Sequence, residues 1–268
     1  MRWSVSGFLS AVRGGTAALL FVCSCLVADA GAFLQPPDQG ILIMGGAFTD
    51  AVRTYDSAGR LVPVAHWRKF ELTTYAEYGL TDWLTAIASP SLFVFRQDPP
   101  GHGREATGIA EAGARARIYA WGDSILSGQV LVRAPLAGAS ARPFADTTRF
   151  VQVDIRAAWG HGFEILGFRA FSDLQVGFRS SGNFGNEARI DGTLGIWAFE
   201  PLLLLFQSFT AATPGRIGQV AYLSQKAQVS AVYWLTPSVG LQVGGLFALR
   251  GVNSDAERGV FSALWVKF

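Results

Sequence analysis

Residues 69–96 read KFELTTYAEYGLTDWLTAIASPSLFVFR, two amphipathic segments joined by the turn GLTD at positions 79–82. In the first segment Phe70 and Leu72 occupy one set of alternating positions and Glu71 occupies the other. Alternation with a period of two residues predicts a β-strand that has one apolar face and one polar face. Glycine and aspartate between two such strands predict a tight turn. We therefore interpret this stretch as a β-hairpin.

The same alternation recurs along the chain, and no segment after the N-terminus has the 3.6-residue periodicity of a helix. Most of the alternating segments are at least as long as the roughly 9–11 residues that a tilted strand needs to cross a bilayer. The sequence predicts an all-β fold, a transmembrane antiparallel β-barrel of about 12 strands, with ten to fourteen strands as the open range. The expected strands are Ile41–Tyr55, Trp67–Tyr78, Trp83–Arg96, Ala106–Trp121, Ser124–Leu136, Thr147–Trp159, Phe163–Arg179, Glu187–Phe199, Leu202–Thr210, Gln219–Leu235, Val239–Gly251 and Arg258–Phe268.

The connections between these segments alternate between short and long. Short turns on one rim and longer polar loops on the other are typical of bacterial outer-membrane barrels, in which the short turns are periplasmic. We therefore expect short periplasmic turns, longer extracellular loops and two periplasmic termini. The expected turns are 79–82, 122–123, 160–162, 200–201 and 236–238, and the expected loops are Asp56–His66, Gln97–Glu105, Ala137–Asp146, Ser180–Asn186, Ala211–Gly218 and Val252–Glu257.

Five of the eight tryptophans recur once per hairpin, 38, 38, 38 and 37 residues apart, beside the expected short turns. Membrane barrels place aromatic side chains in girdles where lipid meets water. A soluble core gives no reason for such a spacing. The predicted periplasmic girdle consists of Trp83, Trp121, Trp159, Trp197 and Trp234.

The N-terminus has the features of a secretory signal peptide. Arg2 and Arg13 precede the apolar stretch Gly14–Val27, and Ala28 and Ala30 supply the small residues that a signal peptidase requires. A retained membrane anchor is the less favoured alternative, because the apolar stretch is short. We expect the chain to be exported and cleaved.

Removal of residues 1–30 as the signal peptide leaves residues 31–268 as a single barrel domain, and cleavage after Ala32 is the alternative. Both cysteines, Cys23 and Cys25, lie in the removed segment. The mature chain is therefore expected to contain no disulfide and no cysteine-bound metal.

The composition excludes two other classes of protein. Half of the residues are hydrophobic and 16% are charged. After the N-terminus no uninterrupted apolar run reaches the about 18 residues that indicate a transmembrane helix, so a protein with many membrane helices is excluded. The formal net charge of +2 gives no indication of nucleic acid as a partner.

Charged residues on the alternating segments are predicted to face the barrel lumen. A lysine or arginine that faces lipid at the bilayer midplane costs about 2–4 kcal/mol, so the polar faces must point inward. Twelve strands are expected to enclose a narrow lumen. The charges either pair and hold the wall together or line a constriction that selects permeants. The candidate lumen-lining residues are Lys69, Glu71, Glu77, Glu111, Arg115, Arg117, Asp154, Arg156, Arg169, Asp173, Arg179, Arg189, Asp191 and Lys226.

The chain ends on an alternating strand, GVFSALWVKF, whose last residue is Phe268. A terminal aromatic residue on such a strand resembles the signal that the outer-membrane assembly machinery recognises. We expect Phe268 to act as this signal. The other expected partners are outer-membrane lipid, lipopolysaccharide and a small-molecule permeant.

A barrel that hydrolyses lipids or peptides would need a histidine close to a serine or an acid. The chain has three histidines, His66, His102 and His161, each in or beside an expected turn or loop, where a solvated residue is the simpler interpretation. Scattered histidines and the single remaining methionine, Met44, also argue against a copper or zinc site. We expect no catalytic residue, no cofactor and no metal.

The stretch EYGLTDWLTAIASPSL, residues 77–92, resembles the YG-[IL]-TD-[RW]-L hairpin of proteobacterial outer-membrane barrels grouped as the phenol-degradation MetA-like family of transporters. The resemblance extends loosely over residues 40–268 and implies an outer-membrane barrel of a Gram-negative bacterium. It further implies a pore for a small, often aromatic or hydrophobic, solute. A structural or adhesion barrel with a blocked lumen is the first alternative, and a hydrolase at the rim is the second.

Overall fold

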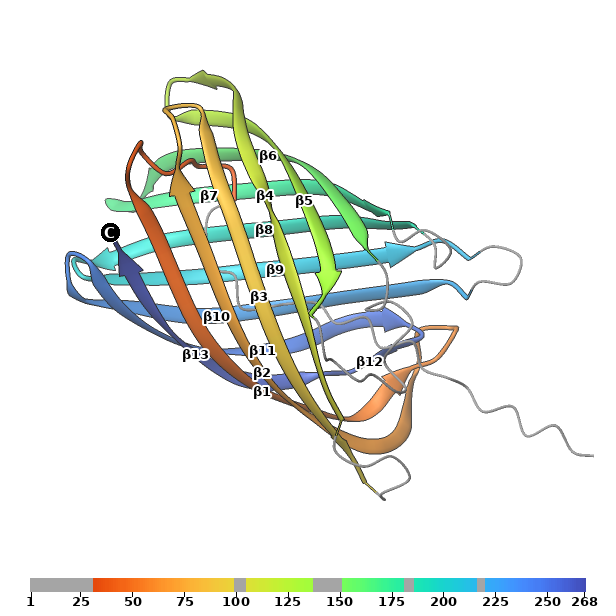
Figure 1. Cartoon of the computed structure of the whole chain (residues 1–268). Helices are drawn as coiled ribbons and strands as arrows, with labels where there is room; N and C mark the ends of the chain where they lie inside the picture. Colours follow the sequence, from red (N-terminus) through yellow and green to blue (C-terminus); the bar gives the residue numbers. More distant parts are fainter. Residues whose placement is uncertain (1–30, 99–104, 137–150, 181–185, 216–219) are drawn as a thin grey trace, which may run out of the picture.

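The computed structural model describes residues 31–98, 105–136, 151–180, 186–215 and 220–268. Within these residues the chain forms one antiparallel sheet that closes on itself, because β1 pairs with β13 on one side and with β2 on the other (Figure 1). Twelve strands are long, and β12 has two residues. The strands are β1 Gly40–Tyr55, β2 Leu61–Gly79, β3 Leu84–Gln97, β4 Glu105–Trp121, β5 Ser124–Pro135, β6 Gln152–Ile165, β7 Phe168–Ser180, β8 Asn186–Phe199, β9 Leu202–Thr213, β10 Tyr222–Thr236, β11 Val239–Val252, β12 Ser254–Asp255 and β13 Arg258–Lys267.

The predicted twelve-stranded antiparallel barrel is confirmed. Each long strand pairs with its neighbours in sequence, and the long strands have 10 to 19 residues, enough for a tilted strand to cross a bilayer. No helix among the described residues is long and apolar enough to span a membrane. The predicted signal peptide, residues 1–30, and His102 lie outside the described residues.

The outer surface of the barrel is apolar and its interior is polar, the reverse of a soluble sheet protein. On β2 the side chains of Phe70 and Leu72 are 46% and 49% exposed, whereas Lys69 and Glu71 between them are 4% and 1% exposed. Phe70 lies opposite Val94 on β3, so the apolar face continues across the hairpin. This is the arrangement of a barrel that meets lipid outside and a lumen inside.

The third short turn lies at Leu166 and Gly167, and the prediction of a turn at residues 160–162 was wrong. Leu166 and Gly167 have φ values of 51° and 81°, the left-handed conformations that a tight two-residue hairpin turn needs. Strand β6 consequently continues to Ile165, and His161 pairs with Ser172 on β7. Gly160 is a glycine for another reason, since a Cβ there would come within 2.7 Å of the Phe33 ring.

This turn supports a prediction for a matched pair of glycines. Gly167→Ala should destabilise the barrel by about 1–2 kcal/mol, because an L side chain is strained at positive φ although nothing lies within 4 Å of the new Cβ. Gly162→Ala, in the neighbouring strand without positive φ, should change stability by less than about 1 kcal/mol. Urea unfolding of both variants in lipid vesicles measures the difference. Equal effects would contradict the position of the turn.

The first long loop is also shorter than predicted. Strand β2 begins at Leu61 rather than Trp67, because Leu61 pairs with Tyr55 and the ladder continues past a bulge in β2, opposite Val52 of β1. The connection is the turn at 56–60, in which the Asp56 carboxylate accepts hydrogen bonds from the backbone N–H groups of Ala58 and Arg60.

The N-terminal segment, which we define as residues 31–38, enters the barrel at the end that carries the short turns. Ala32 is fully buried, and the ring of Phe33 packs edge-on against Phe171 with 6.2 Å between ring centroids. The segment joins the sheet edge at Gly79, whose carbonyl accepts a hydrogen bond from the Asp38 N–H at 3.0 Å. Residues 31–38 therefore occupy part of the lumen.

The connection between β11 and β13 folds inward at the opposite end, which carries the long loops. Ser254 and Asp255 form β12 against the end of β1, and Ser254, Asp255 and Glu257 are all buried. Asn253, with a φ of 49°, turns the chain into this path. The barrel is thus narrowed at both ends by segments of its own chain.

Candidate functional site: the barrel interior

The first group of interior charges, the N-terminal clamp, holds the N-terminal segment. Arg115 on β4 pairs with the Glu77 carboxylate on β2 at 2.7 Å and donates to the Phe33 carbonyl at 2.8 Å. Gln35 donates to the second Glu77 oxygen at 2.8 Å. One arginine and one glutamate on the wall therefore bind two points of the segment. The clamp consists of Tyr75, Glu77, Arg115 and Gln129, with Tyr75 donating to Glu77 and Gln129 accepting from Arg115.

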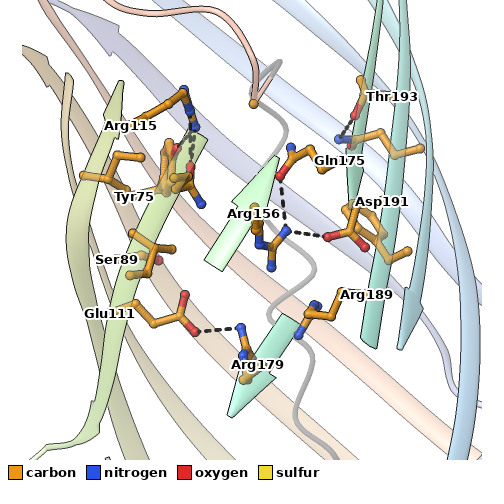
Figure 2. A pocket seen from close by; sticks show the side chains of 16 residues that line it. Tyr75, Ser89, Glu111, Arg115, Arg156, Gln175, Arg179, Arg189, Asp191 and Thr193 are labelled. Atoms are coloured by element: carbon orange, nitrogen blue, oxygen red, sulfur yellow. Dashed lines mark hydrogen bonds and ion pairs between the residues drawn. The ribbon is translucent and has the colours of Figure 1, made fainter. Parts of the chain in front are cut away.

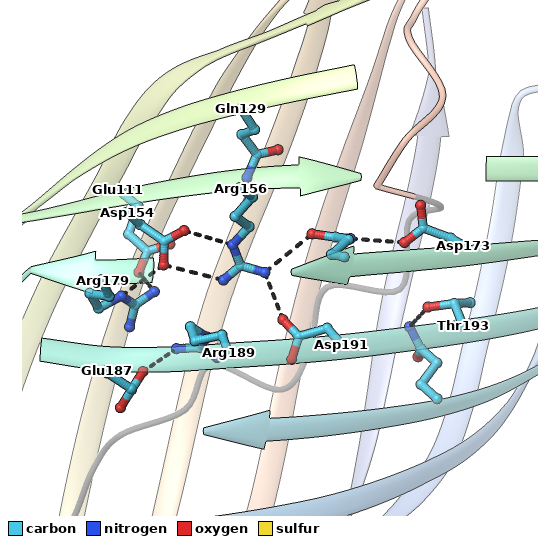
Figure 3. Close-up of polar contacts among 12 residues, drawn as sticks. Glu111, Gln129, Asp154, Arg156, Asp173, Arg179, Glu187, Arg189, Asp191 and Thr193 are labelled. Carbon is cyan, nitrogen blue, oxygen red and sulfur yellow. Dashed lines mark hydrogen bonds and ion pairs between the residues drawn. The ribbon is translucent and has the colours of Figure 1, made fainter. Parts of the chain in front are cut away.

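The second group, the central network, spans five neighbouring strands from β4 to β8 (Figure 3). Arg156 pairs with Asp154 at 2.7 Å and with Asp191 at 2.6 Å. Arg179 pairs with Asp154 at 2.9 Å and lies 3.5 Å from Glu111. Alternate residues of adjacent strands bring these side chains together on the inner face. The members are Glu111, Arg133, Asp154, Arg156, Arg179, Glu187, Arg189 and Asp191.

The third group holds the inward connection between β11 and β13. Glu257 accepts a hydrogen bond from Thr49 at 2.6 Å, pairs with Lys69 at 3.0 Å and contacts Lys226. Burial opposes ionisation of Glu257, but the ammonium groups of Lys226 and Lys69 outweigh it and hold the pKa of that carboxyl below its ordinary value. Because the pKa is lowered on folding, this contact is present above the ordinary glutamate pKa and is lost only in strong acid. Glu71 completes the group through Lys69 at 3.2 Å.

On β9, β10 and β11 the interior wall carries several buried amides, beside the Lys226 charge near the long-loop end. Gln207 donates to Thr193 at 3.2 Å and accepts from Gln228 at 3.3 Å, which links β8, β9 and β10. Gln242 accepts a hydrogen bond from the Trp265 indole at 3.0 Å. The interior therefore has a charged side and a largely neutral polar side.

A cavity of about 90 Å³ lies between the clamp and the central network (Figure 2). Pockets for drug-sized ligands measure roughly 300–1,000 Å³, so this cavity is large enough for water but not for such a ligand. Its lining combines arginines with the apolar side chains of Ile87, Leu131 and Phe209. Gly31 of the N-terminal segment also lines it. The lumen is therefore constricted at its centre while the segment is inserted.

Twelve of the fourteen candidate lumen-lining residues lie inside the barrel, with side chains buried or nearly so. They are Lys69, Glu71, Glu77, Glu111, Arg115, Asp154, Arg156, Asp173, Arg179, Arg189, Asp191 and Lys226.

The other two, Arg117 and Arg169, lie on the rim, and their assignment to the lumen was wrong. The side chain of Arg117 is 36% exposed and pairs with Asp82, because it lies near the short-turn end of β4, beside the bulge that follows it. The side chain of Arg169 is 62% exposed and pairs with Glu200, because it follows the displaced turn at residues 166–167.

Sequence reasoning missed four buried charged residues, Arg133, Glu187, Asp255 and Glu257. Arg133 alternates with the lipid-facing Val130 and Val132, so the face of β5 could have identified it. Asp255 and Glu257 fall in an expected loop, where no periodicity predicts that the chain turns inward.

The tryptophan girdle is only partly as predicted. Trp83, Trp121 and Trp159 are exposed on the outer surface, although Trp159 lies within β6 and not beside a turn. Trp197 is half-buried, with the Arg169 guanidinium 5.6 Å from its ring centroid. Trp234 is 8% exposed and packs edge-on against Trp265 inside the barrel, so its assignment to the girdle was wrong.

Trp234 faces inward because alternation along β10 places Val232 and Trp234 on the inner face of the strand. The two tryptophans belong to an apolar cluster, against which Phe171 also packs, together with Ile41, Ile43, Tyr75, Ile87, Leu131, Leu203, Leu205, Val232 and Ala263. Phe268, at the C-terminus, is exposed and stacks on Tyr78 with 6.4 Å between ring centroids.

The two described histidines lie at opposite rims. His161 stacks between Trp159 and Phe163, and its Nδ1 atom lies 2.9 Å from the Ser124 hydroxyl. His66 lies 3.2 Å from Asp50. The described residues contain no group of three or more histidine, cysteine or acidic side chains that could hold a metal ion.

Solved outer-membrane barrels have a similar structure. An outer membrane channel from Pseudomonas putida F1 superposes with a TM-score of 0.68, covering 90% of this chain and 100% of that one at 14% identity. The NanC porin gives a TM-score of 0.52 over 84% of this chain and 98% of that one at 8% identity. The translocator domain of the autotransporter NalP from Neisseria meningitidis gives 0.50 over 89% and 91% at 11% identity.

No family model matches the sequence, and no curated protein matches it. At these low identities the likeness shows the fold alone. The chain has the fold of the bacterial outer-membrane β-barrels, and its apolar outer surface is the one such a barrel presents to lipid.

Proposed function

We propose that this chain forms a narrow pore in the bacterial outer membrane, which passes a small solute when the N-terminal segment leaves the lumen. The observation that carries the proposal is a charged cavity at the centre of a closed barrel, bounded by a segment that polar contacts hold in place. The proposed role involves no reaction and no cofactor.

The lining of the cavity supports a class of solute. Arginine and amide side chains on one side can bind a polar group, while Ile87, Leu131 and Phe209 offer apolar contact. A small molecule with a polar group on an apolar or aromatic body fits both. This agrees with the aromatic or hydrophobic solute that the sequence resemblance implies.

The test is a comparison of two arginines on one strand. In planar bilayers the wild-type protein should open rarely, and Arg115→Met should open several-fold more often, because it loses the contacts with Glu77 and Phe33. Arg117→Met, two residues away on the rim, is the matched control and should behave like the wild type. Conductance in none of the three proteins would favour a structural barrel with a blocked lumen.

The small size of the cavity is the observation that favours this structural alternative.

The second alternative, a hydrolase at the rim, depends on the contact between Ser124 and His161. A lipase and peptidase assay of the wild type and His161→Ala would test it. The pore proposal includes two partners. The outer-membrane assembly machinery recognises Phe268, and the long-loop end contacts lipopolysaccharide.

A further inference from the structure

The barrel interior contains a carboxylate aimed at the residue that signal cleavage would place first in the mature chain. Asp173 on β7 is 3% exposed, and the backbone N–H groups of Gly31 and Ala32 hydrogen-bond to its carboxylate. Gln175 donates to its Oδ1 atom at 2.9 Å, while Oδ2 is buried without a hydrogen-bond partner among the described residues. Asp173 is thus a buried charge that the described side chains only partly compensate.

The surroundings of Gly31 fit a chain terminus. A Cβ on Gly31 would lie 1.9 Å from the Gln175 amide, so only glycine approaches this wall so closely. Gln175 lies opposite Asp191 across the β7–β8 ladder, and Asp191 lines the same cavity as Gly31. Asp191 is already paired with Arg156 at 2.6 Å, so Asp173 is the acidic residue left for the Gly31 nitrogen.

We infer that signal cleavage after Ala30 creates the ligand for this site: the α-ammonium group of Gly31, which pairs with Asp173 inside the barrel. Cleavage converts the Gly31 N–H, a single donor, into a charged group with three donors. Hydrogen bonds between ionised partners are stronger than neutral ones, and a buried carboxylate is stable only with such a partner. Processing of the chain would thereby fix the N-terminal segment in the lumen.

The α-ammonium site adds a third point of attachment to the N-terminal segment. Arg115 and Glu77 bind it at Phe33 and Gln35, and the inferred pair binds its first residue. The inference does not depend on what passes through the barrel, so it stands or fails separately from the proposed function.

Selective chemical labelling of the α-amine tests the inference. The mass of the purified mature protein must first correspond to a chain that begins at Gly31. An amine-reactive ester near neutral pH then labels the α-amine, and the N-terminal tryptic peptide reports the rate in folded and urea-unfolded protein. An ion pair with Asp173 disfavours the neutral amine that the reagent attacks, so labelling of the folded protein should be slow.

The decisive comparison is Asp173→Asn, which leaves the amine equally buried but removes the pair. Labelling of the folded variant should be at least about tenfold faster than that of the wild type, the change expected for one charge-assisted hydrogen bond. Asp82→Asn, on the exposed rim beside Arg117, is the matched control and should leave the rate unchanged. If Asp173→Asn does not fold, Asp173→Ser supplies the same comparison.

Three results would overturn the inference. A mature chain that begins at Phe33 would lack Gly31 altogether. Equal labelling of folded and unfolded wild type would place the amine in solvent. Equal slow labelling of wild type and Asp173→Asn would mean that burial protects the amine without an ion pair.

Discussion

Deletion of residues 31–38 is expected to turn a mostly closed barrel into a permanently open pore, with a single-channel conductance several-fold above that of the wild type. The segment places Ala32 and Phe33 inside the short-turn end, where Ala32 is fully buried and Phe33 packs on Phe171. Removing these residues joins the central cavity to the solvent at that end. No ladder hydrogen bond between long strands involves residues 31–38, so the barrel itself should still form.

Planar-bilayer recordings of the mature protein and of a variant that begins at Gln39 measure this effect. The matched control is the double substitution Gln35→Ala/Pro36→Ala, which keeps the segment and the Phe33 contacts and removes only the bond from Gln35 to Glu77. It should open more often than the wild type but with the same conductance at each opening. A deletion variant that folds and still does not conduct would show that the inward connection at Glu257 closes the barrel on its own.

The barrel was predictable because one physical requirement applies at every strand. A residue that faces lipid must be apolar and its neighbour faces the lumen, so β2 shows its faces in the sequence through Phe70, Glu71 and Leu72. The same rule predicts that Asp154, Arg156 and Asp191 face the lumen, and all three side chains lie inside the barrel. Where a strand is regular, alternation alone fixes the direction of each side chain.

The errors fall at the rim or where a glycine has more than one use. Arg117 and Arg169 keep the alternation of the buried Arg115 and Asp173 but lie at the exposed rim, so counting by twos gives their face and not their depth. The sequence predicts a turn at Gly160, whereas the missing side chain of this glycine makes room for Phe33, which is 127 residues earlier in the sequence. A contact of that kind leaves no local signal.

The central constriction could not be predicted for a related reason. It depends on residues 31–38, and the narrowing at the long-loop end depends on Glu257; both belong to segments outside the long strands. Irregular segments have no period from which a direction could be inferred. The sequence therefore predicted the wall and its charges but not the chain that fills the lumen.

Substitution of Asp154 is expected to have the largest effect on the stability of the barrel. Its carboxylate, 1% exposed, pairs with Arg156 at 2.7 Å and with Arg179 at 2.9 Å. Asp154→Asn removes the charge that both guanidinium groups share and leaves them close together in the interior. Breaking a buried ion pair by removing one partner costs about 3–5 kcal/mol, and we expect a loss of this size.

Urea unfolding in lipid vesicles, followed by tryptophan fluorescence, measures the loss. Arg169→Gln is the matched control, because it breaks an ion pair of similar length, 2.7 Å to Glu200, on the exposed rim. Exposed pairs contribute about 0–1 kcal/mol, so the control should unfold close to the wild type. The contrast between the two variants isolates burial as the cause.

The same pair of variants separates the two roles that the sequence left open for the interior charges. If they hold the wall together, Asp154→Asn loses stability, and a second substitution, Arg179→Met, recovers part of it because the unpaired charge is removed as well. If they instead select permeants, Asp154→Asn unfolds like the control, and the ratio of anion to cation permeability shifts toward anions. The connectivity of the network favours the first outcome, because its ion pairs join β4 to β5, β4 to β7 and β6 to β8.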